Sequence, residues 1–120
     1  MTFPVEIVLK GRDFAVTEAL HVPSPSQPEW DDATVHAVLV EILRAIGRVE
    51  DPQAAPDRPV VLHGFSWIVE PIDDGVVIAI EIPMGAAVAG PFKVGQAELD
   101  AGISRVIRAD RQVRQPDTIH

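Results

Sequence analysis

Two apolar, β-branched runs lie between residues 65 and 82, joined by the tripeptide Asp73-Asp74-Gly75. An Asp-Gly pair between two such runs is typical of a β-hairpin, because glycine readily adopts the positive φ that a two-residue hairpin turn needs. A fold built around this stretch must therefore contain an antiparallel sheet. With Asp74 and Gly75 as the turn, the predicted pairs are Asp73 with Val76, Val69 with Ile80, and Trp67 with Ile82.

The predicted register gives the two faces of the hairpin different characters, because side chains alternate between faces along a strand. One face is apolar apart from Asp73 beside the turn, and we expect it to face the core. A three-residue loop would shift the pairing by one residue and place Glu70 among the isoleucines, so the hydrophobic pattern favours the two-residue turn. The predicted core-facing residues are Phe65, Trp67, Val69, Pro71, Val76, Ile78, Ile80 and Ile82.

The opposite face of the hairpin is the candidate functional surface. It mixes apolar and acidic side chains, whereas a solvated sheet face normally carries more polar residues. Apolar residues gathered on an exposed surface are typical of an interface or a pocket, although isolated exposed apolar residues are ordinary. We predict that a second subunit, or a ligand between the sheet and a loop, covers this face. The candidate residues are Ile68, Glu70, Ile72, Val77, Ala79 and Glu81.

The N-terminal segment predicts further strands. Residues 5–9 alternate between apolar and other side chains, as a strand does when one face is buried. Residues 14–20 fit either a second strand or a short helix capped by Asp13. Their valine, threonine and phenylalanine, directly after a glycine turn, favour the strand, with Phe14 and Val16 inward.

Two helices are predicted from apolar residues at helical spacing. The first spans about residues 29–49, where Ser26 and Glu29 have the spacing of a capping box. The second spans about residues 94–111. It contains Gly102, which weakens a helix by about 1 kcal/mol relative to alanine unless it serves a close approach to a neighbouring element. Before this helix, the small residues between Met84 and Pro91 predict a tight loop or a backbone packed close to another element.

These segments predict the order strand, strand, helix, strand, strand, helix. The economical arrangement is an α+β fold of two layers, with a mainly antiparallel sheet of about four strands and both helices on one face. Its 120 residues suffice for one domain with its own core. We assign residues 1–111 to that domain and expect residues 112–120 to form a flexible tail.

Composition narrows the functional classes. The chain has no cysteine, which excludes disulfides, thiolate metal sites and thiol nucleophiles and fits a cytoplasmic protein. The first residues lack the pattern of a signal peptide, and no apolar run is long enough to span a bilayer. The formal net charge of −8 repels nucleic acid and anionic lipid, so we predict neither as a partner. A basic protein partner is compatible with this charge.

No catalytic motif is present. Asp32 and His36 are spaced to meet on one face of a helix, but the sequence places no third metal ligand beside them. Gly85 and Gly90 have the spacing of a phosphate-binding loop, but proline and phenylalanine follow where lysine and a hydroxyl residue belong. We therefore predict no catalytic residue, no metal site and no cofactor.

Two classes of function remain. We favour a non-enzymatic protein-interaction or assembly module that works as a homo-oligomer, most simply a homodimer. The alternative is a small-ligand-binding protein or enzyme, with a pocket between the first helix, the sheet and the loop at residues 85–90. Its contacts would include Trp30, His36 and His63. A flat, self-complementary patch favours the first class, and an apolar pocket with converging polar groups favours the second.

Overall fold

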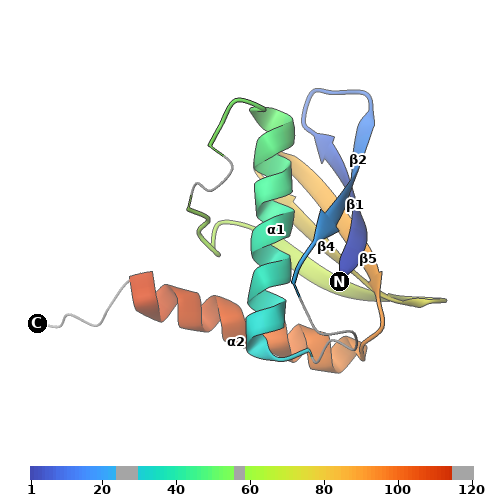
Figure 1. Cartoon of the computed structure of the whole chain (residues 1–120), viewed down its shortest axis with the longest axis vertical. Helices are drawn as coiled ribbons and strands as arrows, with labels where there is room; N and C mark the ends of the chain where they lie inside the picture. The colour runs from blue at the N-terminus through green and yellow to red at the C-terminus, as the bar shows by residue number, and fades with distance from the viewer. Residues whose placement is uncertain (24–29, 56–58, 115–120) are drawn as a thin grey trace, which may run out of the picture.

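The computed structural model describes residues 1–23, 30–55 and 59–114, in which five strands and two helices are formed (Figure 1). The predicted α+β class is confirmed, but the sheet has five strands instead of four. The strands are β1 (Thr2–Leu9), β2 (Ala15–His21), β3 (Ser66–Ile72), β4 (Gly75–Ile82) and β5 (Gly85–Phe92), and the helices are α1 (Asp32–Glu50) and α2 (Gln96–Arg114).

The sheet is antiparallel throughout, with the strand order β2-β1-β5-β4-β3. β1 and β2 form a hairpin, which confirms the strand interpretation of residues 14–20. Phe14, which was predicted to point inward, is instead exposed because it lies in the turn before β2 begins at Ala15.

The prediction of a loop at residues 85–90 is wrong, because these residues form most of the central strand β5. β5 pairs with β1 on one side and with β4 on the other, so its backbone groups have partners on both sides. Ala87 and Ala89 are buried on the side where α1 packs. Pairing and burial together outweigh the weak strand propensity of alanine and glycine.

The predicted hairpin is formed by β3 and β4, but its register differs from the prediction by two residues. Ile72 pairs with Gly75 and Val69 pairs with Ile78, so Asp73 and Asp74 make the turn. A shift of two residues leaves every side chain on its predicted face. The predicted inner face is indeed the core face for Val69, Val76, Ile78 and Ile80, which are buried, and for Phe65, Trp67 and Ile82, which are half-buried, whereas Pro71 is exposed.

Gly75 explains why the turn was misplaced. It begins β4 with a φ of +144°, and a side chain there would overlap the carbonyl oxygen of Phe92 on β5. Glycine is therefore favoured at this position for two reasons, its positive φ and the close contact with β5.

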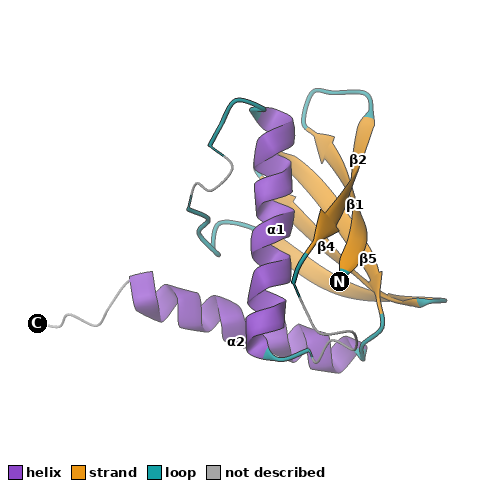
Figure 2. Cartoon of the chain, viewed as in Figure 1, coloured by secondary structure: helices purple, strands orange, loops and turns teal. Residues whose placement is uncertain are grey.

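α1 lies across one face of the sheet and packs against β1, β2 and β5 (Figure 2). It begins one turn later than predicted, since Asp31 is its N-cap and accepts a hydrogen bond of 2.9 Å from the Thr34 amide. This bond is the main reason why the pKa of Asp31 lies below its usual value. The capping box predicted at Ser26 and Glu29 lies outside the described residues.

α2 crosses α1 near the N-terminal end of α1, and it also packs against β3. Gly102 is buried here, and a Cβ at this position would lie 3.3 Å from Val35 Cγ2, so of the two interpretations of this glycine the structure favours a close approach to a neighbouring helix. Arg105 Nη2 lies 3.0 Å from Asp32 Oδ1 across the same crossing. α2 runs to Arg114, beyond the predicted end at 111, and residues 115–120 of the predicted tail lie outside the described part of the chain.

The core therefore lies between one face of the sheet and the two helices. It includes Phe3, Val5, Ile7 and Leu9 of β1, the inner residues of β4 and β5, and the apolar stripes of both helices. We call the sheet face toward the helices the inner face and the opposite one the outer face.

Candidate functional site

The outer face of the sheet carries no helix among the described residues, and its apolar side chains are exposed. Ile68 has 52% of its surface exposed, Ile72 has 45%, Val88 has 44% and Val8 has 41%. The six candidate residues of the hairpin all lie on this face: Ile68, Glu70, Ile72 and Glu81 are exposed, and Val77 and Ala79 are half-buried.

The sheet register arranges the outer residues in rows across the strands. One row runs from Thr17 and Glu6 through Val88 and Ala79 to Ile68. The next row runs from Ala15 and Val8 through Ala86 and Glu81 to Ser66. Apolar side chains on β5, β4 and β3 are thus contiguous, with glutamates beside them.

The half of this face that β1 and β5 supply is not among the residues predicted from the sequence. Val8 and Glu6 belong to the alternating pattern of β1, which showed that they point away from the core. Ala86 and Val88 were hidden because the glycines around them indicated a loop. No local sequence pattern indicates that β5 lies between β1 and β4. The full extent of the outer face therefore becomes visible only once the strand order is known.

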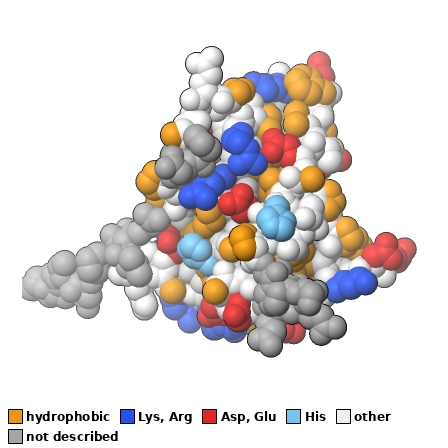
Figure 3. All heavy atoms as spheres, viewed as in Figure 1, with side chains coloured by type: hydrophobic (Ala, Val, Ile, Leu, Met, Phe, Trp, Pro, Cys, Tyr) orange, Lys and Arg blue, Asp and Glu red, His pale blue; other side chains and the backbone are white. Residues whose placement is uncertain are grey.

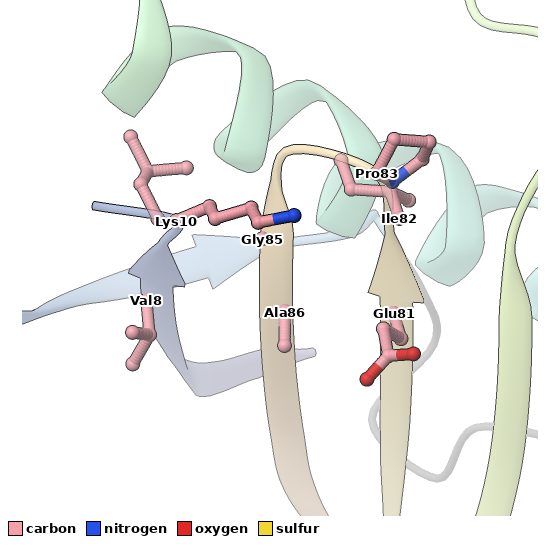
Figure 4. A pocket seen from close by; sticks show the side chains of 8 residues that line it. Val8, Lys10, Glu81, Ile82, Pro83, Gly85 and Ala86 are labelled. Atoms are coloured by element: carbon pink, nitrogen blue, oxygen red, sulfur yellow. The ribbon is translucent and has the colours of Figure 1, made fainter. Parts of the chain in front are cut away.

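Glu81 lines three adjacent depressions. Two of them, of about 470 and 460 Å³, lie at the end of the sheet where β4 turns into β5, and the third, of about 300 Å³, lies on the outer face. The smallest lies over the small residues Ala79 and Ala86, with Ile68 and Val88 on its sides. Figure 4 shows the largest, where Val8, Ala86 and Glu81 project side by side from neighbouring strands. Lys10 extends across the strand ends toward Ile82 and Pro83 in the same view.

The glutamates of the outer face differ from Glu18 and Glu41, which face the helices or lie on them. Glu6, Glu70 and Glu81 are exposed and make no ion pair with a described residue. Glu18 and Glu41 do have partners, since Arg48 Nη2 lies 3.0 Å from Glu18 Oε1 and Arg44 Nη1 lies 3.5 Å from Glu41 Oε1. The outer face therefore combines apolar side chains with carboxylates that no arginine or lysine of the described residues neutralises.

The three residues predicted as pocket contacts do not converge on one site. Trp30 packs edge-on against Phe92, with ring centroids 5.2 Å apart, and closes the edge of the core. His36 is exposed on α1 and lines a depression of about 390 Å³ between the two helices. His63 is exposed in the segment before β3 and lines none of the depressions described above.

The predicted pocket between α1, the sheet and residues 85–90 would require a loop that is in fact β5. Its inward residues Ala87 and Ala89 are buried in the core. The carboxylate of Asp32, which is spaced along α1 to meet His36, accepts hydrogen bonds from Arg105. Within residues 1–23, 30–55 and 59–114, no group of three or more histidine or carboxylate side chains is placed to hold a metal ion.

Comparisons with family models, curated proteins and solved structures found no match to this chain. In the described part of the chain, neither helix combines the length and the apolar character needed to cross a membrane. Any functional conclusion therefore rests on the chain's own geometry.

Proposed function

We propose that this chain is a non-enzymatic protein-interaction module, and that its working surface is the outer face of the sheet. The observation that carries the proposal is the exposure of Ile68, Ile72, Val8 and Val88 on one sheet face while both helices cover the other. Soluble proteins rarely leave a large contiguous apolar surface in water unless it binds something.

The size of the outer face suits a protein partner. The five strands are seven or eight residues long. With a spacing of about 4.8 Å between strands and a rise of about 3.3 Å per residue, the outer face has an area of roughly 600 Å². Contact with a matching surface would bury roughly 1,200 Å² in total, which is within the range of specific interfaces.

A second copy of the chain is the occupant that the sequence predicts. In such a homodimer the two outer faces would meet in an isologous contact. The small side chains of Ala79 and Ala86 are compatible with two sheets packing about 10 Å apart. Another protein on the same face would give the same class of function.

The competing class, a small-ligand-binding protein or enzyme, finds its best support in the depression beside His36. Its wall includes Val106 and Ala109, as an apolar ligand would need, and the carboxylates of Asp32 and Asp110. Both carboxylates already accept hydrogen bonds, from Arg105 and from the Leu62 amide. Few polar groups there remain to orient a ligand, so we place this class second.

Photo-crosslinking in the cells that express the protein tests the proposal. A benzoylphenylalanine at position 88 presents the crosslinker on the outer face, and the same group at position 36 presents it on α1 as a matched exposed control. We expect crosslinks to a polypeptide at position 88 and few at position 36. A product of twice the chain mass would identify a second copy. Absence of crosslinks at 88, or equal yields at both positions, would contradict the proposal.

A further inference from the structure

We propose that the polypeptide bound by the outer face is a cationic amphipathic helix of another protein, an inference that rests on the proposed function above. Two features of the face carry it: the one-sided charge of its side chains, and the hollow over its small residues.

The charge of the outer face has one sign. Glu6, Glu70 and Glu81 are exposed there, and the described strand residues that point outward include no lysine or arginine. Lys10 lies beyond the end of β1, at the rim of the face (Figure 4). The helical side differs, because basic and acidic side chains are interspersed on it (Figure 3).

The positions of the glutamates fit a helix. Glu6 is on β1, whereas Glu81 is on β4 and Glu70 on β3, with β5 between them. Strands about 4.8 Å apart put these carboxylates on two sides of a lane roughly 10–14 Å wide. An α-helix with its side chains is about 10–12 Å across, so it can lie along this lane.

The floor of the lane is apolar and hollowed. Val88 and Ala86 of β5 lie along it, Ala79 and Ile68 continue it toward β3, and the hollow over the two alanines has a volume of about 300 Å³. A large apolar side chain of the bound helix can fill this hollow as a central anchor. Lysine or arginine on the flanks of the same helix would meet the carboxylates on either side.

A second copy fits this pattern less well. Face-to-face contact would bring together two faces that each carry three exposed glutamates and no outward-pointing lysine or arginine on the described strands. Like charges brought together in an interface oppose association, whereas a cationic helix turns the same carboxylates into attractive partners.

Two synthetic helical peptides of about 18 residues test the inference. Both carry leucine and alanine on one face; one has lysine on the flanks and the other has glutamate at the same positions. We expect the lysine peptide to bind at least 100-fold more tightly in fluorescence anisotropy, with a loss of affinity between 50 and 500 mM salt. In two-dimensional NMR its binding should shift the amide signals of β5 and β4.

A charge-neutral variant locates the contact. Replacing Glu6, Glu70 and Glu81 by glutamine should weaken binding of the lysine peptide at least tenfold. The control variant changes net charge equally but away from the outer face, with Glu50→Gln on α1 and Glu98→Gln and Asp100→Asn on α2, all exposed positions. The affinity of this control variant for the lysine peptide should fall less than twofold.

The outcomes separate this inference from the proposed function. Equal binding of both peptides, binding of neither, or equal losses in the two variants would overturn the cationic helix. So would a wild-type dimer in sedimentation that Ile68→Asp converts to a monomer, but this result would support the proposed function with a second copy as partner. Unchanged peptide binding in Ile68→Asp and Val88→Asp would overturn the cationic helix on this face, whereas absence of crosslinks at position 88 would contradict the proposed function itself.

Discussion

Gly75 joins the β3–β4 hairpin to the centre of the sheet. Its φ of +144° disfavours any side chain, and a Cβ there would overlap the Phe92 carbonyl oxygen. Gly75→Ala should therefore lower the free energy of unfolding by about 3 kcal/mol, from backbone strain and from displacement of β5. Urea denaturation followed by circular dichroism measures the loss.

Gly11 supplies the control for this change. It also has a positive φ, +85°, but a Cβ there would have nothing within 4 Å. Gly11→Ala should cost only the strain of a left-handed backbone, about 1–2 kcal/mol. Equal losses in the two variants would mean that the contact with Phe92 does not select glycine at position 75.

β5 is the element that most clearly shows what local patterns can and cannot predict. β1 was predictable because apolar residues alternate along it, and β3 and β4 because they are apolar, β-branched runs on either side of an Asp-Gly pair. The alternation of side chains between the faces of a strand then placed Ile68 and Glu81 on the correct face. β5 was not predictable, because alanine and glycine have weak strand propensity. These residues form a strand here because β5 pairs with β1 on one side and with β4 on the other. The hairpin turn was misplaced for a related reason: Gly75 lies in close contact with Phe92 on β5, and this contact cannot be seen in the local sequence.

The two faces of β5 should respond differently to added volume. Ala87 is buried on the inner face, so Ala87→Leu would overpack the space beneath α1 and lower the free energy of unfolding by about 1–3 kcal/mol. Ala86 is half-buried on the outer face, beside open depressions, so Ala86→Leu should change the same quantity by less than about 0.5 kcal/mol. Thermal and urea denaturation of both variants measure the two changes in the free energy of unfolding. Similar losses in the two variants would indicate that the outer side of β5 is also packed against other atoms.

At the scale of the whole molecule, the buried core of the described residues lies on one side of the sheet. A single core between the inner face and the helices contains the buried residues, and the outer face is left to solvent in the isolated chain. The sequence could place half of the outer face, from β3 and β4, but the rest required the strand order β2-β1-β5-β4-β3. A surface assembled from strands far apart in sequence has no local signature.

Adjacent residues of β3 test whether the outer face belongs to the folding core. Val69 is 2% exposed, and Val69→Thr puts an unpaired hydroxyl into the core at a cost of about 1–3 kcal/mol. Ile68 points outward, and Ile68→Thr keeps a β-branched side chain, so the free energy of unfolding should change by less than about 0.5 kcal/mol. Urea denaturation at 2 and at 200 µM protein extends the test to association. If the glutamates keep two copies apart, the midpoints at the two concentrations should coincide; a higher midpoint at 200 µM that Ile68→Thr abolishes would instead reveal a dimer through this face.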